Sequence, residues 1–137
     1  MKNSIKAIEI EAFGGPENMQ LVDKPLPVPG PGEVRVRLRA IGVNLIDTYH
    51  RTGLYPIPLP SGLGVEGAGE VEAVGDGIDL PVGARVAMTM ALGAYAEAII
   101  LPAAALITLP DAVSFEQAAA ILLKGMTVDY LLSLIHI

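Results

Sequence analysis

The sequence predicts a mainly β fold with a few helices. Fifteen glycines and eleven prolines among 137 residues indicate many turns and irregular connections. Residues 33–43, EVRVRLRAIGV, alternate apolar and polar side chains, as a strand with one buried face does. Because 52% of the residues are hydrophobic and only 18% are charged, we expect one globular domain with a real core.

The strands follow one another along most of the chain. Residues 5–13 predict the first strand, a Pro/Gly loop follows at 25–32, and 33–43 is the clearest strand. Its two faces would carry Val34, Val36, Leu38 and Ala40 on one side and Arg35, Arg37 and Arg39 on the other. The arginines indicate either a basic patch or, more simply, a solvated strand face. Further strands are expected at 69–75, 84–90, 94–101 and 105–109.

Helices are predicted at two places. Residues 44–51 would form one or two turns, with Asn44 as the N-cap and Gly53 as the stop. Ser114 and Gln117 have the spacing of a capping box, which predicts a helix over 115–124 that ends at Gly125. A second helix would begin at 127, and His136 within it is expected to have no functional role.

A glycine motif at residues 62–67 matches the dinucleotide fingerprint G-x-G-x-x-G. That fingerprint binds phosphate only where it follows a strand and opens a helix. Here the glycines follow a proline-rich loop and precede a strand. We therefore interpret them as positions where two backbones pass closely or where φ is positive at a tight corner.

Charge and cysteine content exclude several classes of function. The net charge of −6 argues against nucleic-acid binding, which needs surplus lysine and arginine. The absence of cysteine excludes disulfides, thiolate nucleophiles and cysteine-based metal sites, and it fits a cytoplasmic protein. Residues 1–15 do not resemble a secretory signal. The most apolar run, 98–110, is shorter than the about 20 residues that span a bilayer, so we expect no membrane insertion.

Two long segments resemble one known family. FGGPENMQ…EVEAVG (13–75) and LGAYAEAI…VDYLL (92–132) are similar to the N-terminal half of the medium-chain dehydrogenase/reductases. The branch they resemble most is the zinc-free quinone oxidoreductase (zeta-crystallin-like) group. The resemblance implies a GroES-like, partly open β-barrel over residues 1–124. Residues 125–137 would begin a connecting helix toward a nucleotide-binding Rossmann domain that lies outside this sequence.

The resemblance also implies a reaction, namely metal-free hydride transfer from NADPH to a quinone or an activated alkene. Zinc-dependent relatives carry cysteine at the position of Asn44 and histidine at that of Val65, so no catalytic metal is expected. The full-length protein would be a homodimer, and the N-terminal part alone would be inactive. Two alternatives remain: a zinc-free enoyl reductase of the same superfamily, and a non-catalytic GroES-like binding module.

Six residues are carried over from the family as site candidates. The catalytic candidates are Asn44, Asp47 and Tyr49, and the cofactor-binding candidates are Asn44, Tyr49, Tyr55, Lys124 and Thr127. Each has a structural alternative: a helix cap for Asn44, a first-turn acid for Asp47, packing for the tyrosines and a helix-end cation for Lys124. We expect Glu66 to be structural and hydrogen-bonded in a corner, and His50 to lie at the surface.

Overall fold

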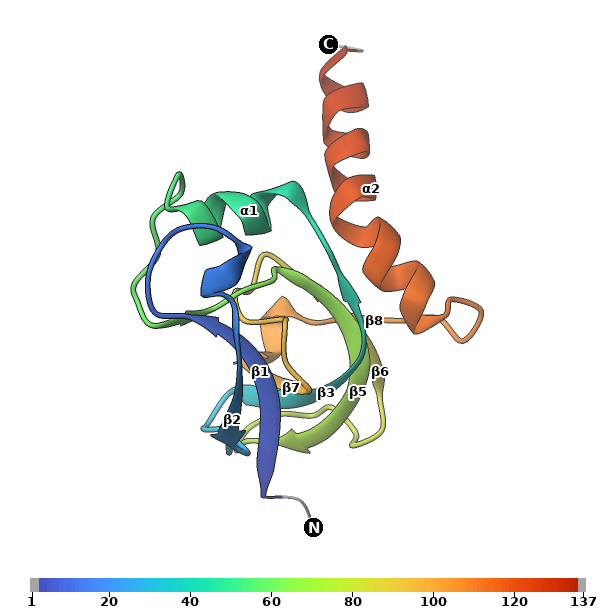
Figure 1. The fold of residues 1–137 in the computed structure, drawn as a ribbon. Coiled ribbons are helices and arrows are strands. Elements are labelled where there is room, and N and C mark those ends of the chain that lie inside the picture. Colours follow the sequence, from blue (N-terminus) through green and yellow to red (C-terminus); the bar gives the residue numbers. More distant parts are fainter. Residues whose placement is uncertain (1–2, 136–137) are drawn as a thin grey trace.

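The computed structural model describes residues 3–135 as two antiparallel sheets that curve around a common core, with two α-helices beside them (Figure 1). The smaller sheet contains β1 (Ser4–Ile10), β2 (Gln20–Pro25) and β4 (Ser61–Gly62) in the order β2-β1-β4. The larger contains β3 (Glu33–Gly42), β5 (Glu66–Val74), β6 (Arg85–Thr89), β7 (Ala98–Pro102) and β8 (Ile107–Thr108) in the order β7-β3-β5-β6-β8. The predicted mainly β, GroES-like fold is confirmed.

The core lies on the inner face of the larger sheet. Its buried members are Val34, Val36, Val71, Val86, Met88, Ala94, Ile99 and Leu101. The alternation predicted for β3 holds for its first half, where valines are buried. The alternation is interrupted by two register shifts in the β3–β5 pairing, one between Arg35 and Val36 and one between Leu38 and Ala40. Leu38 and Ala40, which were predicted to face inward, are therefore only half-buried.

The arginine face of β3 is an ion-paired surface. Arg35 and Arg37 both bind Glu72, with shortest nitrogen–oxygen distances of 2.8 Å each, and Arg39 binds Glu70 at 2.7 Å. Since the carboxylates come from the neighbouring strand β5, these contacts are cross-strand pairs. The carboxylates neutralise the arginines, which speaks against a basic patch. Only Arg39 is exposed as a solvated strand face would be, because the Arg35 and Arg37 side chains are only 14% and 24% exposed.

Replacing Glu72 with glutamine is expected to remove stability that exists only above acidic pH. Burial alone would raise the pKa of the Glu72 carboxyl, but its bonds to Arg37 and Arg35 outweigh burial and hold the pKa below its ordinary value of 4.5. Such a group stabilises the fold above pH 4.5 and loses that effect as the pH falls through its folded-state pKa. Melting temperatures at pH 7 and pH 3 should show a wild-type advantage that shrinks in acid, whereas Glu11→Gln at an exposed site should show none.

The glycines of the 62–67 motif behave as interpreted. β5 begins at Glu66, so the motif leads into a strand and no helix follows it. Gly64 has φ of +85°, and a Cβ there would lie 2.3 Å from Cδ1 of Tyr95. At Gly69, further along β5, a Cβ would lie 2.0 Å from the carbonyl oxygen of Arg37 on the paired strand. These positions need glycine for backbone geometry and close approach.

Both helices begin where the sequence predicts. α1 (Leu45–Thr52) has Asn44 as its N-cap and ends at Gly53 with φ of +80°. α2 (Phe115–Ile135) opens with the predicted capping box: the Gln117 N–H donates to the Ser114 hydroxyl at 3.1 Å, and the Ser114 N–H donates to the side-chain carbonyl of Gln117 at 2.9 Å.

The helix stop predicted at Gly125 is wrong. α2 is one continuous helix of 21 residues, so the separate helix expected from 127 is its second half, and His136 lies outside the described residues. A glycine ends a helix by adopting positive φ, and Gly125 does not. Its neighbours Leu123, Lys124 and Met126 are strong helix formers, which offset the roughly 1 kcal/mol that an interior glycine costs.

Two strand predictions need correction, and two strands were missed. β2, the short β4 in a segment expected to be loop, and the 3-10 turn Pro16–Asn18 were not predicted. The strand expected over 94–101 begins only at Ala98, because Gly93 (φ +106°) turns the chain and Tyr95 bonds instead to Leu63 and Ile8. The strand expected over 105–109 shrinks to β8, since Ala103–Ala105 form a 3-10 turn.

α2 packs its first half on the larger sheet and extends away from it with the second (Figure 1). Ala118 and Ala119 are buried against Ala68 and Ala87, where small side chains let the helix approach the strands. Most large apolar residues further along are exposed: Met126, Val128, Tyr130, Leu131, Leu132, Leu134 and Ile135. By length and composition alone, α2 is the one helix in the described part of the chain that could cross a membrane. Of its most apolar 18-residue stretch, 11% is buried.

Candidate functional site

Asn44 lies at the corner where β3 passes into α1. β3 ends at Gly42, and Asn44 adopts an extended conformation as the N-cap, with φ of −133°. Its backbone N–H donates to Oδ2 of Asp47 at 2.8 Å, which is one half of a capping box. The backbone of Asn44 is therefore fixed by α1, while its side-chain amide is engaged elsewhere.

The Asn44 amide lies between Glu66 and Lys124. Its Nδ2 donates to Oε2 of Glu66 at 2.8 Å, and its Oδ1 accepts from Nζ of Lys124 at 2.8 Å. Lys124 also donates to Oε2 of Glu66 at 3.3 Å. Glu66 is fully buried at the start of β5, whereas the Lys124 side chain on α2 is 52% exposed. The three groups thus form a polar corner, defined as Asn44, Glu66 and Lys124, that is buried at the carboxylate and open at the ammonium.

Asp47 is buried behind this corner. It is 5% exposed, and its Oδ2 accepts the Tyr95 hydroxyl proton at 2.7 Å as well as the Asn44 N–H. Among residues 3–135, its Oδ1 has no hydrogen-bond partner. Burial, and next the hydrogen bond to Asp47 and its negative charge, raise the pKa of the Tyr95 hydroxyl above its ordinary value of 10.

Replacing Tyr95 with phenylalanine is expected to lower stability at neutral pH by about 1–2 kcal/mol, because a buried carboxylate loses a donor. The difference should narrow above pH 10, where the unfolded tyrosine ionises and the folded one does not. Urea unfolding at pH 7 and at pH 10.5 measures both effects. Tyr130→Phe, at an exposed position on α2, is the matched control, and equal behaviour of the two variants would contradict the prediction.

The other predicted site residues form no hydrogen bond with the polar corner within residues 3–135. Tyr49 and Tyr55 form an edge-to-face pair at the end of α1, with ring centroids 5.2 Å apart, and Tyr55 is half exposed. The Thr127 hydroxyl donates to the Leu123 carbonyl at 2.9 Å within α2. His50 is half-buried, not at the surface as expected, and lies near Tyr55 at 6.5 Å between centroids.

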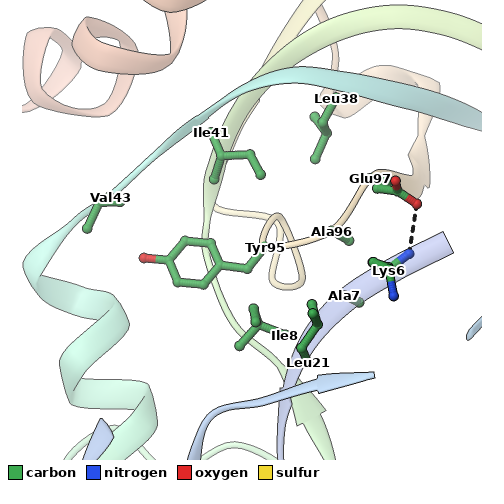
Figure 2. A pocket seen from close by; sticks show the side chains of 10 residues that line it. All are labelled: Lys6, Ala7, Ile8, Leu21, Leu38, Ile41, Val43, Tyr95, Ala96 and Glu97. Atoms are coloured by element: carbon green, nitrogen blue, oxygen red, sulfur yellow. Dashed lines mark hydrogen bonds between the residues drawn. The ribbon is translucent and has the colours of Figure 1, made fainter. Parts of the chain in front are cut away.

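Val43, next to Asn44, lines three separate cavities. An apolar pocket of about 480 Å³ lies between β1 and β3, and its wall includes Leu38, Ile41 and Val43 (Figure 2). In Figure 2 the Tyr95 ring lies across this pocket with its hydroxyl toward α1. A second cavity of about 540 Å³ follows α2 to Lys124, and a third of about 250 Å³ reaches Asn44 and Asp47. Apolar walls with a few polar groups at one corner are typical of small-molecule sites.

The residues present fit one end of a nicotinamide cofactor. An open ammonium and an amide beside an apolar wall suit a polar ring and its ribose. The glycine-rich turn that would hold the pyrophosphate is not found before either helix of residues 3–135. In the same part of the chain no three His, Cys, Asp or Glu side chains gather as a metal site, and Val65 is buried.

Comparison with known proteins assigns the family. Residues 30–111 match the alcohol dehydrogenase GroES-like domain. The chain belongs to this family. It is 58% identical over 130 residues to a quinone oxidoreductase of Pseudomonas aeruginosa, and this alignment covers 93% of this chain and 40% of that protein. The crystal structure of Escherichia coli quinone oxidoreductase complexed with NADPH superposes with a TM-score of 0.89 at 50% identity, over 93% of this chain and 40% of that one.

Another relative carries a different activity in its name. A 2-haloacrylate reductase of a Burkholderia species is 43% identical over 141 residues, covering 96% of this chain and 42% of that protein. The chain spans about 40% of the length of these relatives and corresponds to their N-terminal part. The predicted resemblance to the quinone oxidoreductases, limited to the N-terminal GroES-like half, is confirmed.

Sequence reasoning brought Asn44, Asp47 and Lys124 forward and missed Tyr95. Glu66 is hydrogen-bonded in a corner as expected, but its partners are the site candidates Asn44 and Lys124 themselves. Tyr95 was not singled out, although it holds Asp47. Nothing in the local pattern around GAYAE marks that hydroxyl as a partner of a carboxylate 48 positions away.

Proposed function

We propose that this chain is the N-terminal catalytic part of an NADPH-dependent quinone oxidoreductase that transfers hydride without a metal. The observation that carries the proposal is the polar corner, in which Lys124 and Asn44 converge from 80 positions apart beside apolar cavities. The names of the relatives, 50–58% identical, support the substrate and cofactor class.

Bound NADPH would supply the hydride. This chain would contribute the wall against which a flat acceptor lies and the donors that stabilise negative charge on its oxygen. The free N–H of Lys124 would be such a donor, and Oδ1 of Asn44 would hold the ammonium in direction. Preorganised N–H groups at a developing oxyanion lower the barrier most in a dry site. Asp47 holds Asn44 in place, and Tyr49 and Tyr55 would line the approach at the end of α1. Thr127, one turn beyond Leu123 on α2, is proposed as a contact to the ribose.

A reductase of activated alkenes is the second candidate. The similarity to a 2-haloacrylate reductase favours it, and hydride addition to such an alkene also places charge on a conjugated oxygen. The polar corner serves both reactions, so a substrate panel has to separate them. Dimerisation of the full-length protein, its cytoplasmic location and the division at residues 124 and 125 remain predictions.

A chimaera tests the function. Residues 1–132 of this chain replace the matching part of the Pseudomonas aeruginosa relative, and NADPH oxidation is followed with a quinone, a 2-haloacrylate and an enoyl thioester. We expect turnover with the quinone by the chimaera and none by the 137-residue chain alone. A folded chimaera that reduces only an alkene substrate would establish the second candidate.

The isolated chain is expected to bind NADPH weakly, because the described residues contain no pyrophosphate cradle. Calorimetric titration with NADPH checks this. Tight binding would overturn the division of the cofactor site between two parts of a longer protein. If the isolated chain eluted from size-exclusion chromatography with the mass of an oligomeric ring, that result would instead favour a non-catalytic GroES-like binding module.

A further inference from the structure

We propose that Glu66 is a positioning residue that sets the orientation of the Asn44 amide and of the Lys124 ammonium. Its carboxylate is fully buried and joins three segments: β5, the β3–α1 corner and α2. One oxygen, Oε1, accepts the backbone N–H of Leu123 in α2 at 2.7 Å. The other, Oε2, accepts from Asn44 and Lys124.

The hydrogen-bond chemistry leaves one orientation for Asn44. A carboxylate only accepts hydrogen bonds, so the group of Asn44 that faces Glu66 has to be the NH₂ group. The carbonyl oxygen Oδ1 is thereby turned toward Lys124, an ammonium that only donates. With a carboxamide at position 66, the group that faces Asn44 could either donate or accept, so this side of the corner would no longer fix the orientation of the Asn44 amide.

The same contacts leave one proton of Lys124 for a ligand. An ammonium has three donors, of which one goes to Asn44 and one to Glu66. The third has no partner among the described residues, and the side chain is half exposed at the cavity along α2. That this proton serves a developing oxyanion rests on the proposed function, whereas the positioning by Glu66 does not.

A glycine on the neighbouring strand makes room for the carboxylate. A Cβ at Gly42 would lie 2.3 Å from Oε2 of Glu66 and 2.3 Å from the carbonyl oxygen of Ala119 in α2. Strand β3 therefore approaches both the carboxylate and the helix at a point where only glycine fits. The backbone at this corner is shaped around Glu66, which supports a specific role rather than incidental burial.

Nuclear magnetic resonance on the 137-residue chain tests the positioning directly. In the unaltered chain, couplings across hydrogen bonds should link Asn44 Nδ2 and the Leu123 backbone nitrogen to Cδ of Glu66. In Glu66→Gln, one acceptor oxygen replaces two, so the Asn44 NH₂ signals should shift and their hydrogen exchange should accelerate at least about tenfold. Glu70→Gln, on the same strand but at the surface, should leave them unchanged.

Lys124→Met separates Glu66 from its partner. If Glu66 sets the amide orientation, the coupling from Asn44 to Glu66 survives the loss of the ammonium. The proposal is overturned if the unaltered chain lacks that coupling, if Lys124→Met abolishes it, or if a folded Glu66→Gln leaves the Asn44 signals unmoved. Should Glu66→Gln fail to fold, the unaltered chain and Lys124→Met decide.

The two proposals fail separately. Couplings in place beside an inactive chimaera would refute the reductase and keep the positioning role of Glu66. An active chimaera whose parent chain lacks the couplings would do the opposite.

Discussion

Gly75→Ala is expected to destabilise the fold by at least about 3 kcal/mol, enough to leave a small domain of ordinary stability largely unfolded on mild heating. A Cβ at this position would lie 1.7 Å from the carbonyl oxygen of Gly30 and 3.2 Å from that of Glu33. Both obstacles are backbone atoms, which cannot move aside as the end of a side chain can. The Gly75 N–H also donates to Glu33 at 2.8 Å, so the two segments cannot separate without losing this bond.

Gly77→Ala is the matched control, two residues further along. Gly77 has φ of +80°, and a Cβ added there would meet no atom within 4 Å, so alanine bears only the backbone cost of the left-handed region, about 1–2 kcal/mol. Urea unfolding of both variants and the wild type separates the steric from the conformational cost. Equal losses in the two variants would show that the Gly30 carbonyl can yield.

Asn44→Ala in the chimaera is expected to lower kcat for quinone reduction by about 100-fold. The change removes the acceptor that holds Lys124 and one donor to buried Glu66, so the ammonium loses its defined direction. Because the proposed role is exerted on charge that develops during hydride transfer, kcat should fall more than KM for the quinone rises.

Asn3→Ala, at an exposed position in front of β1, is the control for an asparagine outside the site. Steady-state kinetics and melting temperature are measured on the same preparations, which separates lost catalysis from lost folding. An unchanged kcat in folded Asn44→Ala would leave Asn44 with the role of a helix cap alone.

Local chemistry made much of the fold predictable. Asn44 and Gly53 bound α1, and Ser114 with Gln117 opens α2, because caps depend on residues three or four positions apart. The helix stop predicted at Gly125 was wrong because glycine permits a helix to end but does not require it, and the neighbouring residues decide whether the helix continues. β2 was missed because both of its faces are largely exposed, which leaves no alternation to detect.

The site was predictable only as far as family resemblance named its residues. The contacts that organise it join positions 22, 48 and 58 residues apart: Asn44 with Glu66, Asp47 with Tyr95, and Glu66 with Lys124. No periodic pattern encodes such pairs. A buried carboxylate can be suspected from sequence, but which donors surround it is decided by how β5, α1 and α2 meet.

The hydrogen bond from the Leu123 N–H to Glu66 couples the position of α2 to the polar corner. The helix is continuous from Ala118 and Ala119, which pack on the sheet, to Ile135, and the Glu66 carboxylate accepts its hydrogen bond from Leu123 between these points. A continuous helix resists bending, so a displacement of its C-terminal half would be transmitted along the helix to Leu123, where the backbone is bonded to Glu66. Tilting that half would strain the carboxylate and, through it, turn the amide of Asn44.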